Sequence, residues 1–219
     1  MIPAGAVAWL DRFNAAHPWT HNDAYAGFVL RQAAMTVREG GRSAADIGCG
    51  TGHLLRRLAP LFEQSVGIEA DPDSAARAAH AVRSLPGARV VVDRFPLADG
   101  CRYDFVAMVA VLHHLPLLTG IEAVRGAVAP GGRLAIVGVY REERSDVWLS
   151  LASALLNPVV GFVRHPRRAT GTPEHMTAPT APASDSYAEI VEALSQALPG
   201  VHVRRRLFWR YTASWRAPR

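Results

Sequence analysis

Four residues near the start of the chain have the types and the spacing to hold a ligand that carries an amino group. Asp46, Gly48, Gly50 and Gly52 form the pattern D-x-G-x-G-x-G. Glycine reaches positive φ easily and lets a ligand approach the backbone closely, because it has no Cβ. The carboxylate of Asp46 repels a pyrophosphate and attracts an ammonium group. The pattern therefore favours a ligand with a cationic amino end.

A dinucleotide-binding turn is the alternative for this glycine-rich segment. Its fingerprint is G-x-G-x-x-G/A, in which the third small residue lets the helix pack while the helix N-terminus holds the pyrophosphate. His53 occupies that third position in this chain. A nucleotide-dependent oxidoreductase is therefore the weaker of the two hypotheses.

Four further residues with carboxylate or imidazole side chains each follow an apolar run: Glu69, Asp93, His113 and His114. Glu69 lies about 20 residues after the glycine turn, a distance typical of an acid that accepts hydrogen bonds from ribose hydroxyls. A neutral histidine with a pKa near 6.5 is a suitable general base. Since neighbouring residues at a strand end point in different directions, we expect one imidazole in the pocket and favour His113 over His114.

Strands that end at one edge of a sheet would bring these side chains together. Apolar runs predict strands at 43–47, 65–69, 88–92, 103–110, 133–139, 201–207 and 208–215. Amphipathic periodicity and capping residues predict helices at 20–38, 53–62, 71–85, 121–128, 145–163 and 187–198. This alternation is typical of an α/β fold, in which ligands bind at the carboxyl ends of the parallel strands. The last two strands alternate in polarity and predict an antiparallel hairpin.

These motifs resemble those of the class I S-adenosylmethionine-dependent methyltransferases over roughly residues 41 to 140. The likeness consists of the glycine turn, the Leu-His-His-Leu turn at 112–115 after a strand that Asp104 opens, and the Pro-Gly-Gly turn at 130–132. It implies a Rossmann-like, doubly wound sheet of seven mostly parallel strands, with helices on both faces and an antiparallel C-terminal hairpin. It also implies S-adenosyl-L-methionine as the cofactor, and the sequence shows no metal-ligand spacing.

The resemblance further implies which residues bind the cofactor. The glycine turn would pack against its amino acid end, Glu69 would pair with both ribose hydroxyls, and Asp93 would bind the adenine amino group. Tyr25 would lie against the methionine moiety from a lid helix, although simple packing of that helix on the sheet explains Tyr25 equally well. The complete expected set is Tyr25, Asp46, Gly48, Cys49, Gly50, Gly52, Glu69, Ala70, Asp93, Arg94, Phe95 and Val109.

The turn with the two histidines also bears on the substrate. It is similar to that of small-molecule methyltransferases and differs from the Asn/Asp-Pro-Pro-aromatic tetrapeptide of enzymes that methylate base amino groups. The net charge is +5, but the 24 basic residues are all arginines and mostly dispersed, which favours a solvated surface over a nucleic-acid interface. We therefore expect a small-molecule substrate and no nucleic-acid partner. The sequence leaves the oligomeric state open.

The length of 219 residues favours one domain with additions over two full domains. We divide this single methyltransferase domain, 1–219, into N-terminal lid helices (1–40), a cofactor-binding core (41–140), a substrate-cap insertion (141–185) and a closing helix with hairpin (186–219). The apolar character of the insertion suggests an apolar or aromatic substrate. A dimer contact or a membrane-surface helix is the competing interpretation of the same segment.

The expected location is a reducing cytoplasm, because Cys49 and Cys101 offer no disulfide framework. The chain also lacks a secretory signal pattern. The apolar run 147–163 is interrupted by Asn157 and Pro158 and falls short of the roughly 20 residues of a spanning helix. We therefore expect no integral membrane segment. The alternative function is a catalytically silent methyltransferase-like scaffold at a partner or membrane surface, and the acids of the expected cofactor site argue against it.

Overall fold

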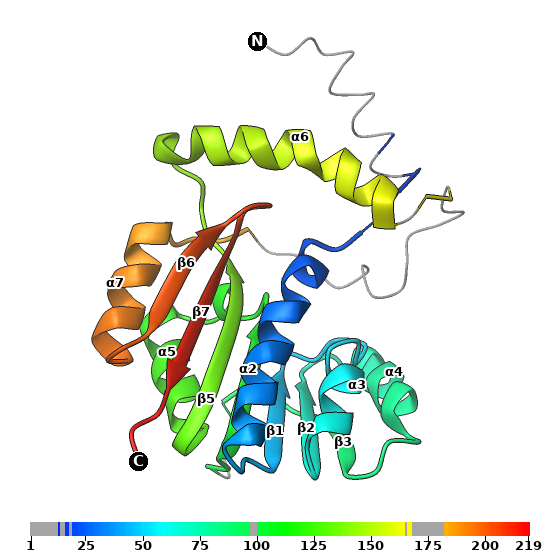
Figure 1. Ribbon diagram of the computed structural model, residues 1–219. Coiled ribbons are helices and arrows are strands. Elements are labelled where there is room, and N and C mark those ends of the chain that lie inside the picture. Colours follow the sequence, from blue (N-terminus) through cyan, green and yellow to red (C-terminus); the bar gives the residue numbers. More distant parts are fainter. Residues whose placement is uncertain (1–12, 14–15, 18, 97–99, 165, 168–181) are drawn as a thin grey trace.

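A seven-stranded mixed sheet forms the centre of the molecule (Figure 1). The computed structural model describes residues 13, 16–17, 19–96, 100–164, 166–167 and 182–219. The strands are β1 (Ser43–Ile47), β2 (Gln64–Glu69), β3 (Ala88–Val92), β4 (Tyr103–Val109), β5 (Val128–Val139), β6 (His202–Arg206) and β7 (Arg210–Arg216). Their spatial order is β3-β2-β1-β4-β5-β7-β6, with β1 to β5 parallel and β7 antiparallel to both of its neighbours. The predicted fold class is confirmed.

Helices cover both faces of this sheet (Figure 1). They are η1 (His21–Tyr25), α2 (Ala26–Arg38), α3 (Leu55–Leu58), η2 (Ala59–Leu61), α4 (Pro72–Val82), η3 (Leu112–His114), α5 (Leu117–Gly126), η4 (Arg144–Asp146), α6 (Val147–Arg164) and α7 (Tyr187–Ala197), where η marks a 3₁₀-helix. Successive side chains of β4 alternate between two cores. Phe105 packs with Val29 of α2, whereas Val106 packs with Ile121 of α5 and Leu194 of α7.

Two predicted helices have different bounds in the structure. The segment 53–62 forms only the single turn α3 followed by the 3₁₀-helix η2, because Pro60 has no N–H to continue the α-helical hydrogen bonds. The helix predicted at 121–128 begins earlier, at Leu117, where Pro116 precedes it and accepts a hydrogen bond from the Gly120 N–H at 2.8 Å. Neither change moves the strand ends that carry the expected site.

The helix α6 continues through Pro158, as the single helix predicted at 145–163 requires, so Asn157 and Pro158 interrupt the apolar run without ending the helix. Together with η4 it forms a stretch, Arg144–Arg164, that is long and apolar enough to cross a membrane by length and composition alone. Its small and polar residues Ser153 and Gly161 are buried against the rest of the protein. The exposed residues are large and apolar: Val147, Trp148, Leu151, Leu155, Leu156, Val159, Phe162 and Val163. α6 therefore presents its apolar face outward.

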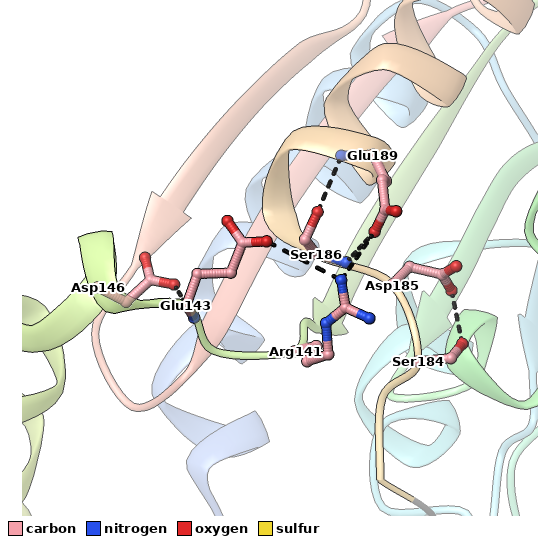
Figure 2. A network of polar contacts seen from close by, with 7 residues as sticks. All are labelled: Arg141, Glu143, Asp146, Ser184, Asp185, Ser186 and Glu189. Atoms are coloured by element: carbon pink, nitrogen blue, oxygen red, sulfur yellow. Dashed lines mark hydrogen bonds and ion pairs between the residues drawn. The ribbon is translucent and has the colours of Figure 1, made fainter.

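The insertion that contains α6 leaves the sheet and returns to it at one place (Figure 2). The guanidinium of Arg141 contacts Glu143 at 3.9 Å and Glu189 at 3.5 Å, so it joins the start of the insertion to α7. The Arg141 N–H also donates to the Asp185 carbonyl at 2.8 Å. Ser186 caps α7 and forms a capping box with Glu189. These contacts fix both ends of the insertion beside the end of β5.

Candidate functional site

A cleft of about 590 Å³ opens at the carboxyl ends of β1, β2 and β4, within the usual size range of ligand sites of roughly 300–1,000 Å³. It brings together most of the residues expected from the sequence: Asp46, Gly48, Cys49, Gly50, Glu69, Ala70, Asp93, Arg94, Phe95, Val109, His113 and His114. The segment around η1, which carries Thr20, Asn22 and Asp23, lines the same cleft. The candidate site therefore lies between the strand ends and this N-terminal segment.

The glycine turn is tightly packed on two sides and open on the third. Gly48, Gly50 and Gly52 have φ values of +68°, +54° and +82°, which favour glycine. A Cβ at position 48 would lie 2.3 Å from Val111 Cγ2, and one at position 52 would lie 3.0 Å from the Ala78 backbone in α4. A Cβ at Gly50 would meet nothing within 4 Å. Gly50 therefore lets a ligand approach the backbone, whereas Gly52 serves helix packing and does not line the cleft.

Glu69 connects the end of β2 to the glycine turn. Its two carboxylate oxygens accept hydrogen bonds from the Gly50 N–H at 2.8 Å and the Asp71 N–H at 3.0 Å. A carboxylate has about four acceptor positions, so two remain for a ligand. Asp93 is exposed, and its Oδ1 accepts from the Arg94 N–H at 2.7 Å. Both acids thus present acceptors at the cleft.

Asp46 is the most perturbed acid of the site. Its side chain is 2% exposed, and its Oδ2 atom is buried without a hydrogen-bond partner among the described residues. Burial and the nearby charge of Glu69 together raise the pKa of this carboxyl to about 7, against the opposing effect of a hydrogen bond from the Leu55 backbone. A buried acceptor without a partner is costly. Asp46 therefore suits a ligand that brings a cationic donor.

Solved structures with the same architecture include methyltransferases. The N-methyltransferase NodS from Bradyrhizobium japonicum, in complex with S-adenosyl-L-homocysteine, is 18% identical with a TM-score of 0.58, and the match covers 97% of this chain and 98% of NodS. The plantazolicin methyltransferase BpumL, in complex with a triazolic desmethyl analogue and S-adenosylhomocysteine, is 12% identical with a TM-score of 0.59, covering 99% and 92%. At these identities the likeness shows a shared fold.

Sequence comparisons extend the likeness from fold to family. A family model described as a methyltransferase domain matches residues 45–134. An uncharacterised methyltransferase of Mycobacterium tuberculosis is 28% identical over 207 residues, covering 92% of this chain and 98% of that protein. The chain contains a methyltransferase domain and is similar to class I S-adenosylmethionine-dependent methyltransferases. The ribosomal protein L11 methyltransferase of Xylella fastidiosa is 36% identical over a shorter match of 110 residues. This match covers 49% of this chain and 35% of that enzyme.

S-adenosylmethionine, the cofactor of this methyltransferase family, fits the chemistry of the cleft. Its ammonium group is the cationic donor that the orphan Oδ2 of Asp46 lacks. Its bulk requires a backbone without side chains, which Gly50 offers. Cys49 contributes backbone only, because its Sγ would lie 2.7 Å from a Cβ at Gly67 and is packed against β2.

The two histidines of the methyltransferase both line the cleft, so the expectation that only one imidazole points there is wrong. They belong to the 3₁₀-helix η3, where successive side chains are about 120° apart rather than on opposite faces. Their ring centroids are 4.0 Å apart. His113 is half-buried, with its Nδ1 atom buried and without a partner among the described residues. Burial, together with the charges of His114 and Arg210, lowers the pKa of His113 to about 4.

Tyr25 takes the second of its two expected positions, in which it packs against the core beside the sheet. It is not among the described residues that line the cleft, and its hydroxyl donates to the Leu207 carbonyl at 2.8 Å in the β6–β7 turn. The 3₁₀ geometry of η1 turns Asn22 and Asp23 toward the cleft instead. Asp23 also approaches His53 of the glycine turn at 3.5 Å. The N-terminal segment thus closes over the cleft through polar residues.

Arg210 is a cleft residue that the sequence analysis missed. The expected alternation in β7 is present, with Tyr211 and Trp215 buried in the core. Trp209 lies in the turn before β7 with φ +55°. Arg210 points to the other side of the strand and lines the cleft. The alternation of side chains in β7 places Arg210 on the face opposite the aromatic residues. This alternation is the sequence signal from which Arg210 could have been predicted to face the cleft.

Proposed function

We propose that this methyltransferase transfers the methyl group of S-adenosylmethionine to a small molecule with an apolar or aromatic body. The bound cofactor supplies a methyl group already activated by the sulfonium. The protein therefore needs mainly to orient the acceptor and to exclude water. The unpartnered buried carboxylate of Asp46 beside an open glycine turn is the observation that supports the cofactor site.

The expected residues that line the cleft receive roles in this proposal, apart from His114. Asp46 binds the amino group, Glu69 binds the ribose hydroxyls through its two free acceptor positions, and Asp93 binds the adenine amino group. Backbone and apolar surface around these groups come from Gly48, Cys49, Gly50, Ala70, Arg94, Phe95 and Val109. His113 is the candidate base for an acceptor that must lose a proton, since its lowered pKa keeps it neutral at pH 7.

The apolar insertion supports an apolar or aromatic acceptor, because it packs on an aromatic cluster that adjoins the cleft-lining residues Thr20, Asn22 and Arg210 without lining the cleft itself. The rings of Trp19 and Phe208 are 4.8 Å apart, and those of His21 and Phe208 are 5.4 Å apart. The Asn157 side chain of α6 accepts from Trp19 Nε1 at 3.0 Å, so the insertion packs on this cluster. The competing class of methyl acceptor is a protein, as the name of the ribosomal protein L11 methyltransferases suggests. Their match covers only 35% of that enzyme, so we favour the small molecule.

Calorimetry with S-adenosylhomocysteine tests the cofactor assignment directly. We expect saturable binding to a single site in the wild-type protein, with an affinity that Glu69→Gln reduces by about tenfold, because a charged acceptor is lost. Glu122→Gln on α5, whose residue does not line the cleft, is the control and should bind like the wild type. No binding at millimolar concentration in the folded wild-type protein would refute the proposal.

The lowered pKa of His113 predicts how stability depends on pH. The folded state takes up a proton near pH 4 and the unfolded state near pH 6.5. The stabilising contribution of the neutral His113 imidazole to the free energy of unfolding is therefore complete above pH 6.5 and is lost as the pH falls toward 4. His113→Gln should reduce the difference in unfolding free energy between pH 6.5 and pH 4 by about 1–2 kcal/mol, after allowance for solvent screening. Urea unfolding at several pH values measures this difference, and an identical difference in the variant contradicts the assignment.

A second candidate function is attachment to an anionic membrane surface through the outward face of α6. Trp148, Leu155 and Val163 on this face are 78%, 64% and 73% exposed. The sequence from 147 to 167 contains arginines at 164 and 167 and no acid. An apolar helix face next to arginines is typical of interfacial helices on anionic lipids.

Vesicle sedimentation tests this attachment. The wild-type protein should sediment with phosphatidylglycerol vesicles and much less with phosphatidylcholine vesicles. The double variant Leu155→Gln, Val159→Gln should lose most of the bound fraction. Leu118→Gln, at a residue of α5 that is 59% exposed, should keep it. Equal sedimentation of the double variant, or a stable dimer that covers α6 in ultracentrifugation, would refute membrane attachment.

A further inference from the structure

Arg210 carries a charge in the cleft that the proposed reaction does not use. Its Nε donates to Asn22 Oδ1 at 2.9 Å, and one terminal nitrogen donates to the carbonyls of Phe208 and Trp209 at 3.3 and 3.4 Å. All three acceptors are neutral. Within the described part of the chain, no carboxylate oxygen lies within 4.0 Å of this guanidinium. Arg210 is thus a half-buried cation without an ionic partner among the described residues.

Two of the other partly buried arginines among the described residues are paired with acids: Arg205 contacts the buried Asp146, and Arg133 contacts Glu39. The third, Arg206, donates to the Thr212 hydroxyl at 3.0 Å. A buried charge is costly unless it is paired. The second terminal nitrogen of Arg210 has no hydrogen bond to a described residue, and the residue lines the cleft. A ligand in the cleft can therefore reach the guanidinium.

The groups around Arg210 leave room for an anion. His113 and His21 have pKa values lowered by burial, and burial raises the pKa of Tyr25. All three are therefore uncharged at pH 7. Burial lowers the pKa of Arg210 itself to about 10, so it remains protonated. The acids that line the cleft lie elsewhere: Asp46, Glu69, Asp71 and Asp93 follow β1 to β3, and Asp23 contacts His53.

The turn before Arg210 fixes the position of its side chain. Phe208 and Trp209 have φ values of +57° and +55°, which are unfavourable for bulky residues and are usually found where the surroundings enforce them. Arg210 donates to both carbonyls of this turn, and the Phe208 N–H donates to Ser153 of α6 at 2.8 Å. A guanidinium held in this way loses little freedom when it binds a ligand.

We propose that Arg210 binds an oxyanion, a carboxylate or its equivalent, that the methyl acceptor carries. A guanidinium pairs with a carboxylate through two parallel hydrogen bonds, which also orients the ligand. This inference rests on the proposed function and narrows it. The acceptor combines an apolar body with one anionic group, and Arg210 presents it next to the neutral imidazole of His113.

Matched probes that differ only in charge test the proposal. Three pairs are suitable: 3-phenylpropionate with 3-phenylpropionamide, benzoate with benzamide, and octanoate with octanamide. Binding is measured by calorimetry or ligand-observed NMR with S-adenosylhomocysteine at saturation. In the wild-type protein the carboxylate of at least one pair should bind about tenfold more tightly than its amide. Arg210→Gln should remove this preference, and Arg210→Lys should retain part of it.

The control is Arg204→Gln, at an exposed residue of β6, which should keep the preference of the wild type. Equal or absent binding of the carboxylate in all three pairs would overturn the inference, as would a preference that survives in Arg210→Gln. If Arg210→Gln does not fold, the comparison of the two probes in the wild-type protein decides alone. Failure of the wild-type protein to bind S-adenosylhomocysteine would instead count against the proposed function.

Discussion

Asp46→Asn should weaken the binding of S-adenosylhomocysteine by about 10- to 100-fold, equivalent to about 1.5–3 kcal/mol for a hydrogen bond to a charged group. The carboxylate is buried and its Oδ2 has no partner among the described residues. Asparagine keeps the shape of the side chain and removes the charge that an ammonium group requires. Calorimetry at pH 8 measures the loss. Asp73→Asn, at an exposed acid in the first turn of α4, is the matched control and should bind normally.

The same substitution should make the ligand-free protein more stable at pH 8. The carboxyl of Asp46 has a folded-state pKa of about 7, raised from 3.8 by burial and by Glu69. The folded state therefore holds a proton between about pH 4 and 7 that the unfolded state has lost, and stability falls as the pH rises through this window. Asparagine does not ionise. Thermal unfolding should show Asp46→Asn more stable by about 1–3 kcal/mol at pH 8 and unchanged below pH 4.

A variant that is less stable than the wild type at pH 8 would contradict this interpretation of Asp46. If Asp46→Asn is more stable but binds the cofactor more weakly, the ionised Asp46 carboxylate destabilises the ligand-free protein and stabilises the complex. Cofactor affinity of the wild-type protein should then rise with pH up to about 7, because the ionised carboxylate is the binding form. In Asp46→Asn this dependence should be absent.

The strand ends could be predicted from the sequence because local patterns specify them. A parallel strand covered on both faces is an unbroken apolar run, and the residue after it lies at the ligand-binding edge. Glu69 and His113 were found in this way, and both line the cleft. The glycine turn was equally visible, since Gly48 and Gly50 need the positive φ values that they have.

The lid side of the cleft could not be predicted in the same way. Arg210 reaches its position through Asn22, a contact between residues 188 positions apart, and through a turn with unusual φ values at two bulky residues. The choice between the two positions expected for Tyr25 could not be made either, because a 3₁₀-helix, not an α-helix, precedes Ala26 and changes the direction of each side chain. Local periodicity reveals neither feature. The proposed acceptor side of the site therefore depends on tertiary contacts, and the proposed cofactor side on local sequence.

Gly48→Ala and Gly50→Ala should separate the structural glycine of the turn from the ligand-facing one. Both positions have positive φ, so each alanine costs roughly 1 kcal/mol in the backbone. Only at Gly48 does the new methyl group meet a side chain, Val111 Cγ2 at 2.3 Å. Val111 directly precedes η3, so its displacement would move His113. We expect Gly48→Ala to lower the free energy of unfolding by about 2–4 kcal/mol, and Gly50→Ala by about 1 kcal/mol.

Gly48→Ala should cause the larger loss of stability, whereas Gly50→Ala should cause the larger loss of cofactor affinity relative to its loss of stability. Gly50→Ala adds a methyl group on the open side of the turn, so a folded, nearly wild-type protein should bind S-adenosylhomocysteine at least about tenfold more weakly. The loss of stability in Gly48→Ala should be partly reversed by Val111→Ala, because the smaller side chain makes room for the new methyl group. Denaturant unfolding of the two single variants and the double variant measures this coupling. If the two losses add, the contact with Val111 is not the cause, and the backbone conformation at position 48 alone accounts for the glycine.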